Sequence, residues 1–157
     1  NLNDDELIIN VQADEPFIEE KVITALQKRL SELKENKENF IMASCYSPIT
    51  KEAALDPNLV KVVLNTNNNA IYFSRSPIPY DRSGNASYFG HIGIYGFDRK
   101  SLKEFCELKD APLEDTEKLE QLRAIYNQKQ ISMVGIETKS FGIDTEEDLQ
   151  RALKVLQ

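Results

Sequence analysis

The chain has 157 residues, of which 41% are apolar and 29% are charged, and its formal net charge is -7. A chain of this length is typical of one domain and buries roughly two thirds of the surface that the unfolded chain exposes. The acidic balance argues against a general nucleic-acid binder, which needs a basic surface to displace counterions from phosphates. It does not exclude a small anionic ligand, because a few locally placed arginines can hold one.

The sequence also argues against a membrane protein and a disulfide-bonded protein. No apolar run approaches the ~20 residues that cross a bilayer, and the polar, acidic start of the chain has no signal-peptide pattern. Cys45 and Cys106 stand alone, which indicates neither a disulfide framework nor a CxxC metal site. We therefore expect a cytoplasmic protein with two buried or idle thiols.

The first part of the chain alternates apolar runs with a helical pattern. Leu7 to Val11 is a β-branched run without alternation, which is typical of a strand covered on both faces. Apolar residues then recur at helical spacing between Val22 and Leu33, with charges on the opposite side. Phe40 to Tyr46 repeats the pattern of a buried strand.

The middle of the chain predicts an antiparallel hairpin. Leu59 to Leu64 and Ala70 to Ser74 flank five polar residues, and asparagine in such a loop tolerates left-handed backbone geometry. Ser76 to Phe89 holds two prolines and predicts an irregular loop. His91 to Phe97 alternates glycine with larger side chains, as in a strand that another backbone or a ligand approaches closely.

The last third predicts helices at Ser101 to Leu108 and Thr116 to Asn127, and a strand at Ile131 to Ile136. Asp144 is a good N-cap for a final helix, and Glu147 completes a capping-box pattern. Strands and helices thus alternate at both ends of the chain with a hairpin between them. This order predicts an α/β fold with an antiparallel insertion.

Two aspartates are candidate metal ligands. Gln12 and Asp14 lie two residues apart at the carboxyl end of the first predicted strand, so both side chains face the same side. Ligands of open α/β sheets bind beyond the carboxyl ends of the strands. Asp14 either holds a divalent cation or caps the next helix, and the local pattern does not separate the two. Asp144 is likewise either a helix cap or a second carboxylate on the same Mg²⁺.

Other candidates have ordinary structural explanations beside functional ones. Arg75 directly follows a strand, and its guanidinium either grips a carboxylate or phosphate or lies on the surface. His91 is the only histidine, and it is either structural or a ligand contact. Glu117, Glu120 and Gln121 share one side of a predicted helix, a pattern typical of a solvated face. The sequence has no GxxxxGK[ST], GxGxxG, HExxH or GxSxG motif.

Taken in order, six segments resemble one family. They are NVQADEP (10–16), LVKVVL (59–64), AIYFSRSPIPYDR (70–82), HIGIYGF (91–97), PLEDTEKLEQLR (112–123) and GIDTEEDL (142–149). The series resembles the 3-deoxy-manno-octulosonate (Kdo) cytidylyltransferases, also called CMP-Kdo synthetases. The patterns YFSR-x-x-IP-x-DR and LEQLR are specific to this branch, whereas NVQADEP and GIDTEEDL have looser relatives among other sugar-nucleotide transferases.

The resemblance implies a fold and a reaction. The fold is a three-layer α/β/α, Rossmann-like domain of the nucleotide-diphospho-sugar transferase type over residues 1–157, with a sheet insertion at about 59–100 for sugar binding and dimerisation. The reaction joins CTP and Kdo to give CMP-Kdo and pyrophosphate, requires Mg²⁺ and serves lipopolysaccharide biosynthesis. The expected enzyme is a cytoplasmic homodimer that binds neither membrane nor nucleic acid.

The family's site residues map onto positions of this sequence that match its motifs. Asp14 and Asp144 would be the metal ligands, and Gln12 would help to position the reacting sugar. The sugar site would be lined by Arg75, His91, Tyr95, Glu120 and Gln121.

The start of this sequence departs from the family pattern. Members of the family begin with a strand and a loop resembling PAR-x-x-S-x-R-x-PGK-P, which binds the CTP phosphates and base. This sequence has no such segment. We therefore expect a fragment that lacks the N-terminal strands, exposes an edge and apolar faces at Leu7 to Val11 and is not active alone. Two alternatives stay open: an enzyme that activates sialic acid or another nonulosonate, and a non-catalytic dimerisation or binding module derived from the family.

Overall fold

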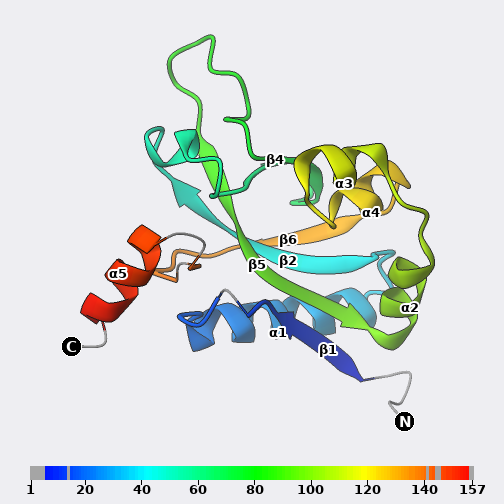
Figure 1. Cartoon of the computed structure of the whole chain (residues 1–157). Helices are drawn as coiled ribbons and strands as arrows, with labels where there is room; N and C mark the ends of the chain where they lie inside the picture. Colours follow the sequence, from blue (N-terminus) through cyan, green and yellow to red (C-terminus); the bar gives the residue numbers. More distant parts are fainter. Residues whose placement is uncertain (1–5, 14, 141, 144–145, 156–157) are drawn as a thin grey trace.

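A computed structural model describes residues 6–13, 15–140, 142–143 and 146–155 of the chain (Figure 1). The elements, in chain order, are β1 (Leu7–Val11), α1 (Glu20–Glu35), β2 (Met42–Ile49), the 3₁₀ helix η1 (Ala53–Leu55), β3 (Lys61–Leu64), β4 (Ala70–Ser74), β5 (Tyr88–Asp98), α2 (Arg99–Glu107), α3 (Pro112–Glu117), α4 (Leu122–Tyr126), β6 (Ile131–Gly135) and α5 (Glu146–Val155).

The strands form one mixed sheet in the order β4-β3-β5-β2-β6, and β1 pairs with β5. β2 and β6 are parallel, whereas β5 is antiparallel to β1, β2 and β3. β1, β2 and β6 therefore point the same way, and the carboxyl ends of these three strands lie at one edge of the sheet. β3 and β4 form the predicted hairpin, and Asn68 in its loop has a φ of 55°, in the left-handed region.

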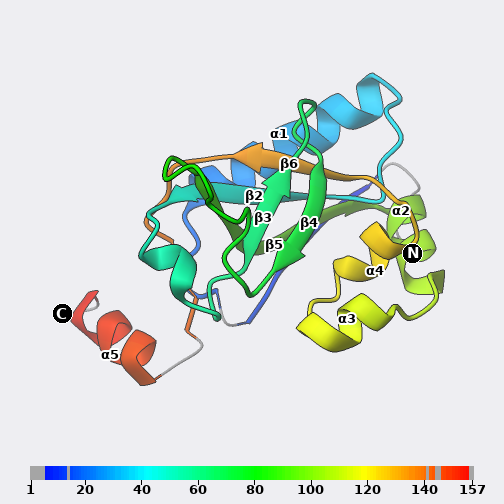
Figure 2. The same ribbon diagram turned by 90° about the horizontal axis from the view of Figure 1, so that it is seen from above.

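Helices cover both faces of the sheet (Figure 2). The buried stripe of α1, including Leu26 and Leu30, packs on Ala43 and Ile94 in one apolar cluster. On the other face, residues from α2, α3 and α4 pack with Met42 in a second cluster. Neighbouring residues of β2 thus serve opposite clusters, because successive strand side chains point to opposite faces. The predicted three-layer α/β/α fold is confirmed.

Glycines in β5 allow close packing, as the sequence predicted. A Cβ at Gly96 would lie 2.5 Å from Leu30 Cδ1, so the missing side chain lets α1 approach the sheet. A Cβ at Gly93 would lie 2.7 Å from Gln12 Oε1, so this glycine makes room for the segment that follows β1.

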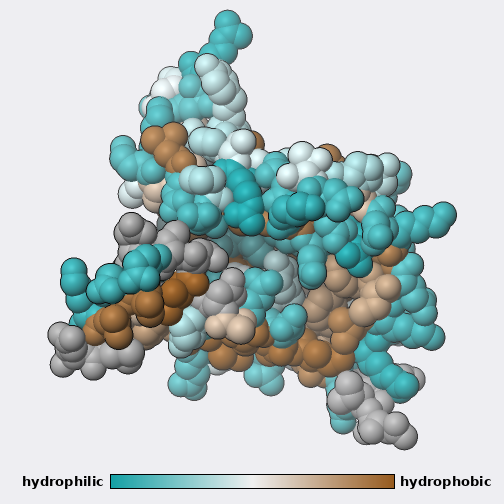
Figure 3. Space-filling model, in the orientation of Figure 1, coloured by the Kyte–Doolittle hydropathy of each residue, from teal (hydrophilic) through white to brown (hydrophobic). Residues whose placement is uncertain are grey.

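β1 is less covered than its apolar run alone indicates, and it exposes part of its apolar faces, as the comparison with the family pattern predicted. Leu7 to Ile9 are only partly buried, and Val11 is 38% exposed. Among the described strands β1 pairs with β5 alone, so its other edge is open, as predicted. Figure 3 shows hydrophobic surface along β1 and on α5, where Leu149 and Leu153 are exposed.

In the part of the chain that the structure describes, no helix has the length and apolar character needed to span a membrane.

The single helix predicted at Thr116 to Asn127 is wrong. α3 ends at Glu117, and Lys118 has a φ of 54°, a left-handed residue whose N–H bonds the carbonyl of Glu114. α4 begins only at Leu122. The break matters for the site, because Glu117 turns toward the end of β4 while Gln121 becomes almost fully buried.

The two thiols differ sharply in environment. Cys45 is fully buried on β2, and burial raises the pKa of its thiol to about 12, whereas Cys106 is exposed. We expect a thiol reagent such as DTNB to modify Cys106 quickly and Cys45 only after unfolding. Cys106→Ser should leave the folded protein unreactive, and two fast-reacting thiols in the folded wild type would contradict the structure.

Candidate functional site

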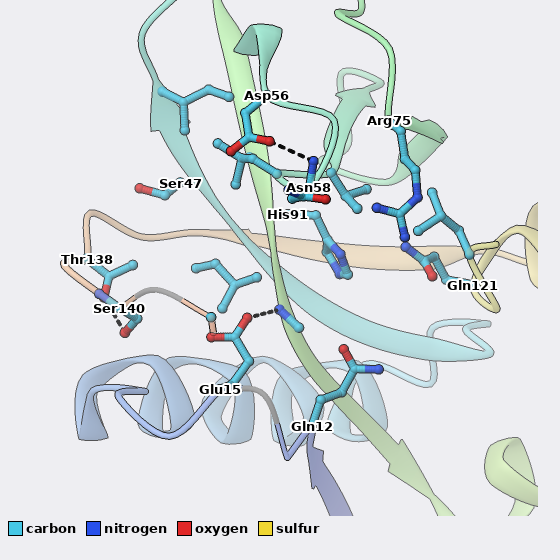
Figure 4. Close-up of a pocket in the computed structure, with 18 of the residues that line it drawn as sticks. Gln12, Glu15, Ser47, Asp56, Asn58, Arg75, His91, Gln121, Thr138 and Ser140 are labelled. Atoms are coloured by element: carbon cyan, nitrogen blue, oxygen red, sulfur yellow. Dashed lines mark hydrogen bonds between the residues drawn. The ribbon is translucent and has the colours of Figure 1, made fainter. Parts of the chain in front are cut away.

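An open pocket of about 620 Å³ lies beyond the carboxyl ends of β1, β2 and β6 (Figure 4). Gln12 and Glu15 line it after β1, Ser47 lines it from the end of β2, and Thr138 and Ser140 line it after β6. This is the edge at which open α/β sheets bind ligands. The pocket continues along β5 to the start of β3, to the end of β4 and to the connection between α3 and α4.

Every predicted site residue that the structure describes lines this pocket. The set is Gln12, Arg75, His91, Tyr95, Glu120 and Gln121. They come from β5 and from the segments that follow β1, β4 and α3, so only the fold brings them together.

The two predicted metal ligands, Asp14 and Asp144, lie outside the described residues. Gln12 and Glu15, on either side of Asp14, line the pocket, and so does Gly142, two residues before Asp144. Among the described residues no group of three or more His, Cys, Asp or Glu side chains could hold a metal ion. The magnesium site stays a prediction that rests on these two aspartates.

Arg75 is held at the pocket by the residue that ends α3. Its backbone N–H and its side-chain Nε donate to Glu117, at 2.9 Å to the carboxylate Oε2 and 2.9 Å to the carbonyl oxygen. The other oxygen of that carboxylate accepts from Ser74 at 2.6 Å. Nη1 of Arg75 donates to the carbonyl of Pro57 at 3.1 Å. Glu117 is therefore a support for Arg75 and not part of a solvated helix face.

A buried lysine lies behind Arg75. Lys61 on β3 is fully buried, and its Nζ donates to the carbonyls of Asp56 at 2.7 Å and Arg75 at 2.5 Å. Burial is the main cause that lowers the pKa of Lys61 below its usual value. Lys61 was not among the predicted site residues, although a lysine inside the apolar run LVKVVL was a signal, because a buried charge needs partners.

His91 is held by a hydroxyl and by two aromatic rings. Its Nε2 lies 2.8 Å from Ser44 Oγ, and its ring contacts Phe73 and Tyr95, with centroids 5.0 and 5.5 Å away. The Tyr95 hydroxyl donates to Gln121 Oε1 at 3.3 Å. Burial lowers the pKa of His91 to about 3, so the imidazole is neutral at physiological pH.

One wall of the pocket depends on Glu19, just before α1. Its carboxylate accepts from Thr138 Oγ1 and from the Lys139 N–H, and its own N–H donates to Ser140 Oγ at 3.0 Å. The hydrogen bond from Thr138, with that from Lys139, lowers the pKa of Glu19 to about 2. No sequence signal could have found this contact, because Glu19 and Thr138 are 119 positions apart.

A family model described as cytidylyltransferase matches residues 1–131, which is most of the chain. The chain belongs to the cytidylyltransferase family.

Curated relatives confirm the resemblance to the Kdo branch. The chain is 50% identical over 154 residues to the 3-deoxy-manno-octulosonate cytidylyltransferase of Wolinella succinogenes, with 96% of this chain covered. It is 53% identical over 159 residues to the protein of the same name from Helicobacter pylori strain J99, with 98% of this chain covered. The chain spans 63% of the length of each of these relatives.

Solved structures agree with the fold. A CMP:2-keto-3-deoxy-manno-octonic acid synthetase complexed with CTP matches with a TM-score of 0.84 and 34% identity, over 96% of this chain and 61% of that one. A Bacillus anthracis protein described as a glucose-1-phosphate thymidylyltransferase matches with a TM-score of 0.56 and 18% identity, which shows the fold alone. The nucleotide-diphospho-sugar transferase type of fold is confirmed.

The support behind Arg75 can be tested through stability. Lys61→Met leaves the carbonyls of Asp56 and Arg75 without their donor, and each unsatisfied buried group costs about 1–3 kcal/mol. We expect the free energy of unfolding, measured by urea titration, to fall by about 2 kcal/mol or more. Lys28→Met, at an exposed position of α1, is the control, with an expected change within about 0.5 kcal/mol. Equal midpoints for the two variants would contradict the role of Lys61.

The low pKa of His91 predicts a pH effect on stability. The pKa of His91 is ~6.5 in the unfolded chain and about 3 in the folded protein. At a pH between these two values only the unfolded state binds the proton, so the free energy of unfolding falls as the pH falls. His91→Gln removes this contribution. We expect the variant to lose less stability than wild type between pH ~7.5 and ~5 in denaturant titrations. Parallel losses in the two proteins would show that His91 titrates normally.

Proposed function

We propose that the protein to which this chain belongs is a 3-deoxy-manno-octulosonate cytidylyltransferase, and that the pocket binds its sugar acid beside CTP. The observation that carries the proposal is the gathering of Gln12, Arg75, His91, Tyr95 and Gln121 around one pocket. The identity of about half to relatives of that name supports the same reaction. The match to a synthetase complexed with CTP supports CTP as the nucleotide.

In the proposed reaction the anomeric hydroxyl oxygen of Kdo attacks the α-phosphorus of CTP. A new oxygen–phosphorus bond forms, the bond from the α-phosphorus to the bridging oxygen breaks, pyrophosphate leaves with that electron pair, and the hydroxyl proton passes to solvent. Reactions of this kind depend mainly on holding the two reactants in line. Gln12, which lies at the end of β1 against Gly93, is the residue proposed to position the attacking sugar.

Arg75 is the proposed partner of the sugar carboxylate. Two of its side-chain N–H groups are used on the carbonyls of Glu117 and Pro57, which fixes the plane of the guanidinium. A guanidinium has five N–H donors, so the remaining ones can bind a carboxylate. Figure 4 shows Arg75 beside Gln121 at the pocket. An acidic sugar would satisfy this site, and a neutral sugar would leave it unpaired, which favours the acid.

Asp14 and Asp144 are the proposed Mg²⁺ ligands, since Mg²⁺ is held in such sites by one or two carboxylates together with phosphate oxygens. When bound, the ion would supply charge neutralisation for the phosphates. The lining of the pocket by residues close to both aspartates in sequence supports this assignment. We also propose that the protein is a cytoplasmic homodimer in which the 59–100 segment contributes to sugar binding and to the dimer contact.

The proposed function is tested on the full-length protein by pyrophosphate release from CTP and Kdo with Mg²⁺. Arg75→Ala should raise the KM for Kdo about 10- to 100-fold, because a hydrogen bond to a charged group contributes about 1.5–3 kcal/mol. The KM for CTP should stay unchanged. Arg99→Ala, on α2 away from the pocket, should leave both values unchanged.

The remaining outcomes separate the alternatives. Turnover with sialic acid but not with Kdo would identify the acylneuraminate branch, and no turnover with either would favour a non-catalytic module. Asp14→Asn should abolish Mg²⁺-dependent turnover. Unchanged turnover in that variant would overturn the metal assignment.

A further inference from the structure

Ser44 lies under the pocket and makes a set of contacts that fixes its proton. It is fully buried on β2, and its Oγ lies 2.7 Å from the carbonyl oxygen of Ile94 and 3.4 Å from that of Ile92. The third partner is His91 Nε2 at 2.8 Å. A serine hydroxyl has one hydrogen to donate and lone pairs with which to accept.

These contacts determine the direction of each hydrogen bond. A backbone carbonyl accepts and never donates, so the Ser44 hydrogen goes to Ile94 at 2.7 Å. The Ser44 oxygen then accepts, and the donor is the N–H on Nε2 of His91. A neutral imidazole carries one proton, which leaves Nδ1 with a lone pair. Within the described part of the chain, no group hydrogen-bonds Nδ1 of His91.

The ring has little freedom to adopt another arrangement. It packs edge-on against Phe73, with an interplanar angle of 70°, and tilted against Tyr95. The low pKa of His91 keeps the second proton off the ring. The imidazole nevertheless borders the pocket, where Figure 4 shows it between Asn58 and Gln121.

We propose that Ser44 is a positioning residue that fixes His91 as the Nε2–H tautomer, so that the ring offers the pocket a hydrogen-bond acceptor. An acceptor binds a hydroxyl and repels a carboxylate or a phosphate oxygen. If the proposed function holds, His91 takes a hydroxyl of the sugar while Arg75 takes its carboxylate. The two residues then set the orientation of the sugar through opposite hydrogen-bond roles.

The tautomer is measured directly by long-range ¹H–¹⁵N NMR of the full-length protein with ¹⁵N-labelled histidine. His91→Gln identifies the His91 signals by their loss. We expect a protonated Nε2 and an unprotonated Nδ1 in wild type. A protonated Nδ1 would overturn the proposal, whatever the enzyme turns over. Ser44→Ala should give signals averaged between the two tautomers, and wild-type-like signals in Ser44→Ala would also overturn it.

Kinetics test the consequence for the ligand. Ser44→Ala should raise the KM for Kdo about 3- to 10-fold, the range of one neutral hydrogen bond, with the KM for CTP unchanged. Ser132→Ala is the matched control, because Ser132 is equally buried on neighbouring β6 and bonds Arg29 instead of His91. An equal rise in Ser132→Ala would show a merely structural effect and overturn the proposal. Lack of turnover in wild type would refute the proposed function, whereas the NMR result would still decide the tautomer.

Discussion

The pairing of β5 with three other strands is the constraint on which the site depends. This strand pairs antiparallel with β2 over most of its length, with β1 near its carboxyl end and with β3 at Gly90. It therefore joins the strands that end at the pocket to the hairpin that carries Arg75. His91, Gly93 and Tyr95 fall on one face of it because strand side chains alternate. The bare backbone at Gly93 leaves the space that Gln12 and Glu15 occupy.

Arg75 and His91, which line the pocket, are held in place by hydrogen bonds to residues that do not line it. Lys61 and Glu117 hold the backbone of Arg75 from two sides, and Ser44 holds the ring of His91. Such support reduces the motion of the side chains that face a ligand, which is the physical basis of preorganised binding. The left-handed residue Lys118 contributes indirectly, since it ends α3 where Glu117 can reach β4.

The proposed roles of Arg75 and His91 separate hydrogen-bond donors from acceptors in this pocket. Arg75 can only donate, whereas a neutral histidine in a fixed tautomer can accept. A sugar acid carries both a carboxylate and hydroxyls, so this division suits it better than it suits a phosphate or a neutral sugar alone. The open edge of β1 and the apolar surface of α5 lie outside this arrangement.

The sequence by itself determined the local elements and the family. Apolar periodicity located α1 and most strands, and the asparagine loop predicted the hairpin turn at Asn68. Those signals are local, because the alternation of a strand or the stripe of a helix is complete within a few residues. The resemblance to the family predicted Arg75 and His91 as site residues, but it did not show that they lie at the same pocket.

Tertiary structure alone decided how those residues are supported. Ser44 and His91 are 47 positions apart and meet only because β2 pairs with β5. The break at Lys118 was invisible to a helical pattern, because lysine favours helix by local preference and yet has a positive φ here. Hydrogen bonds between distant residues depend on strand order and register, and a single sequence contains no local record of either.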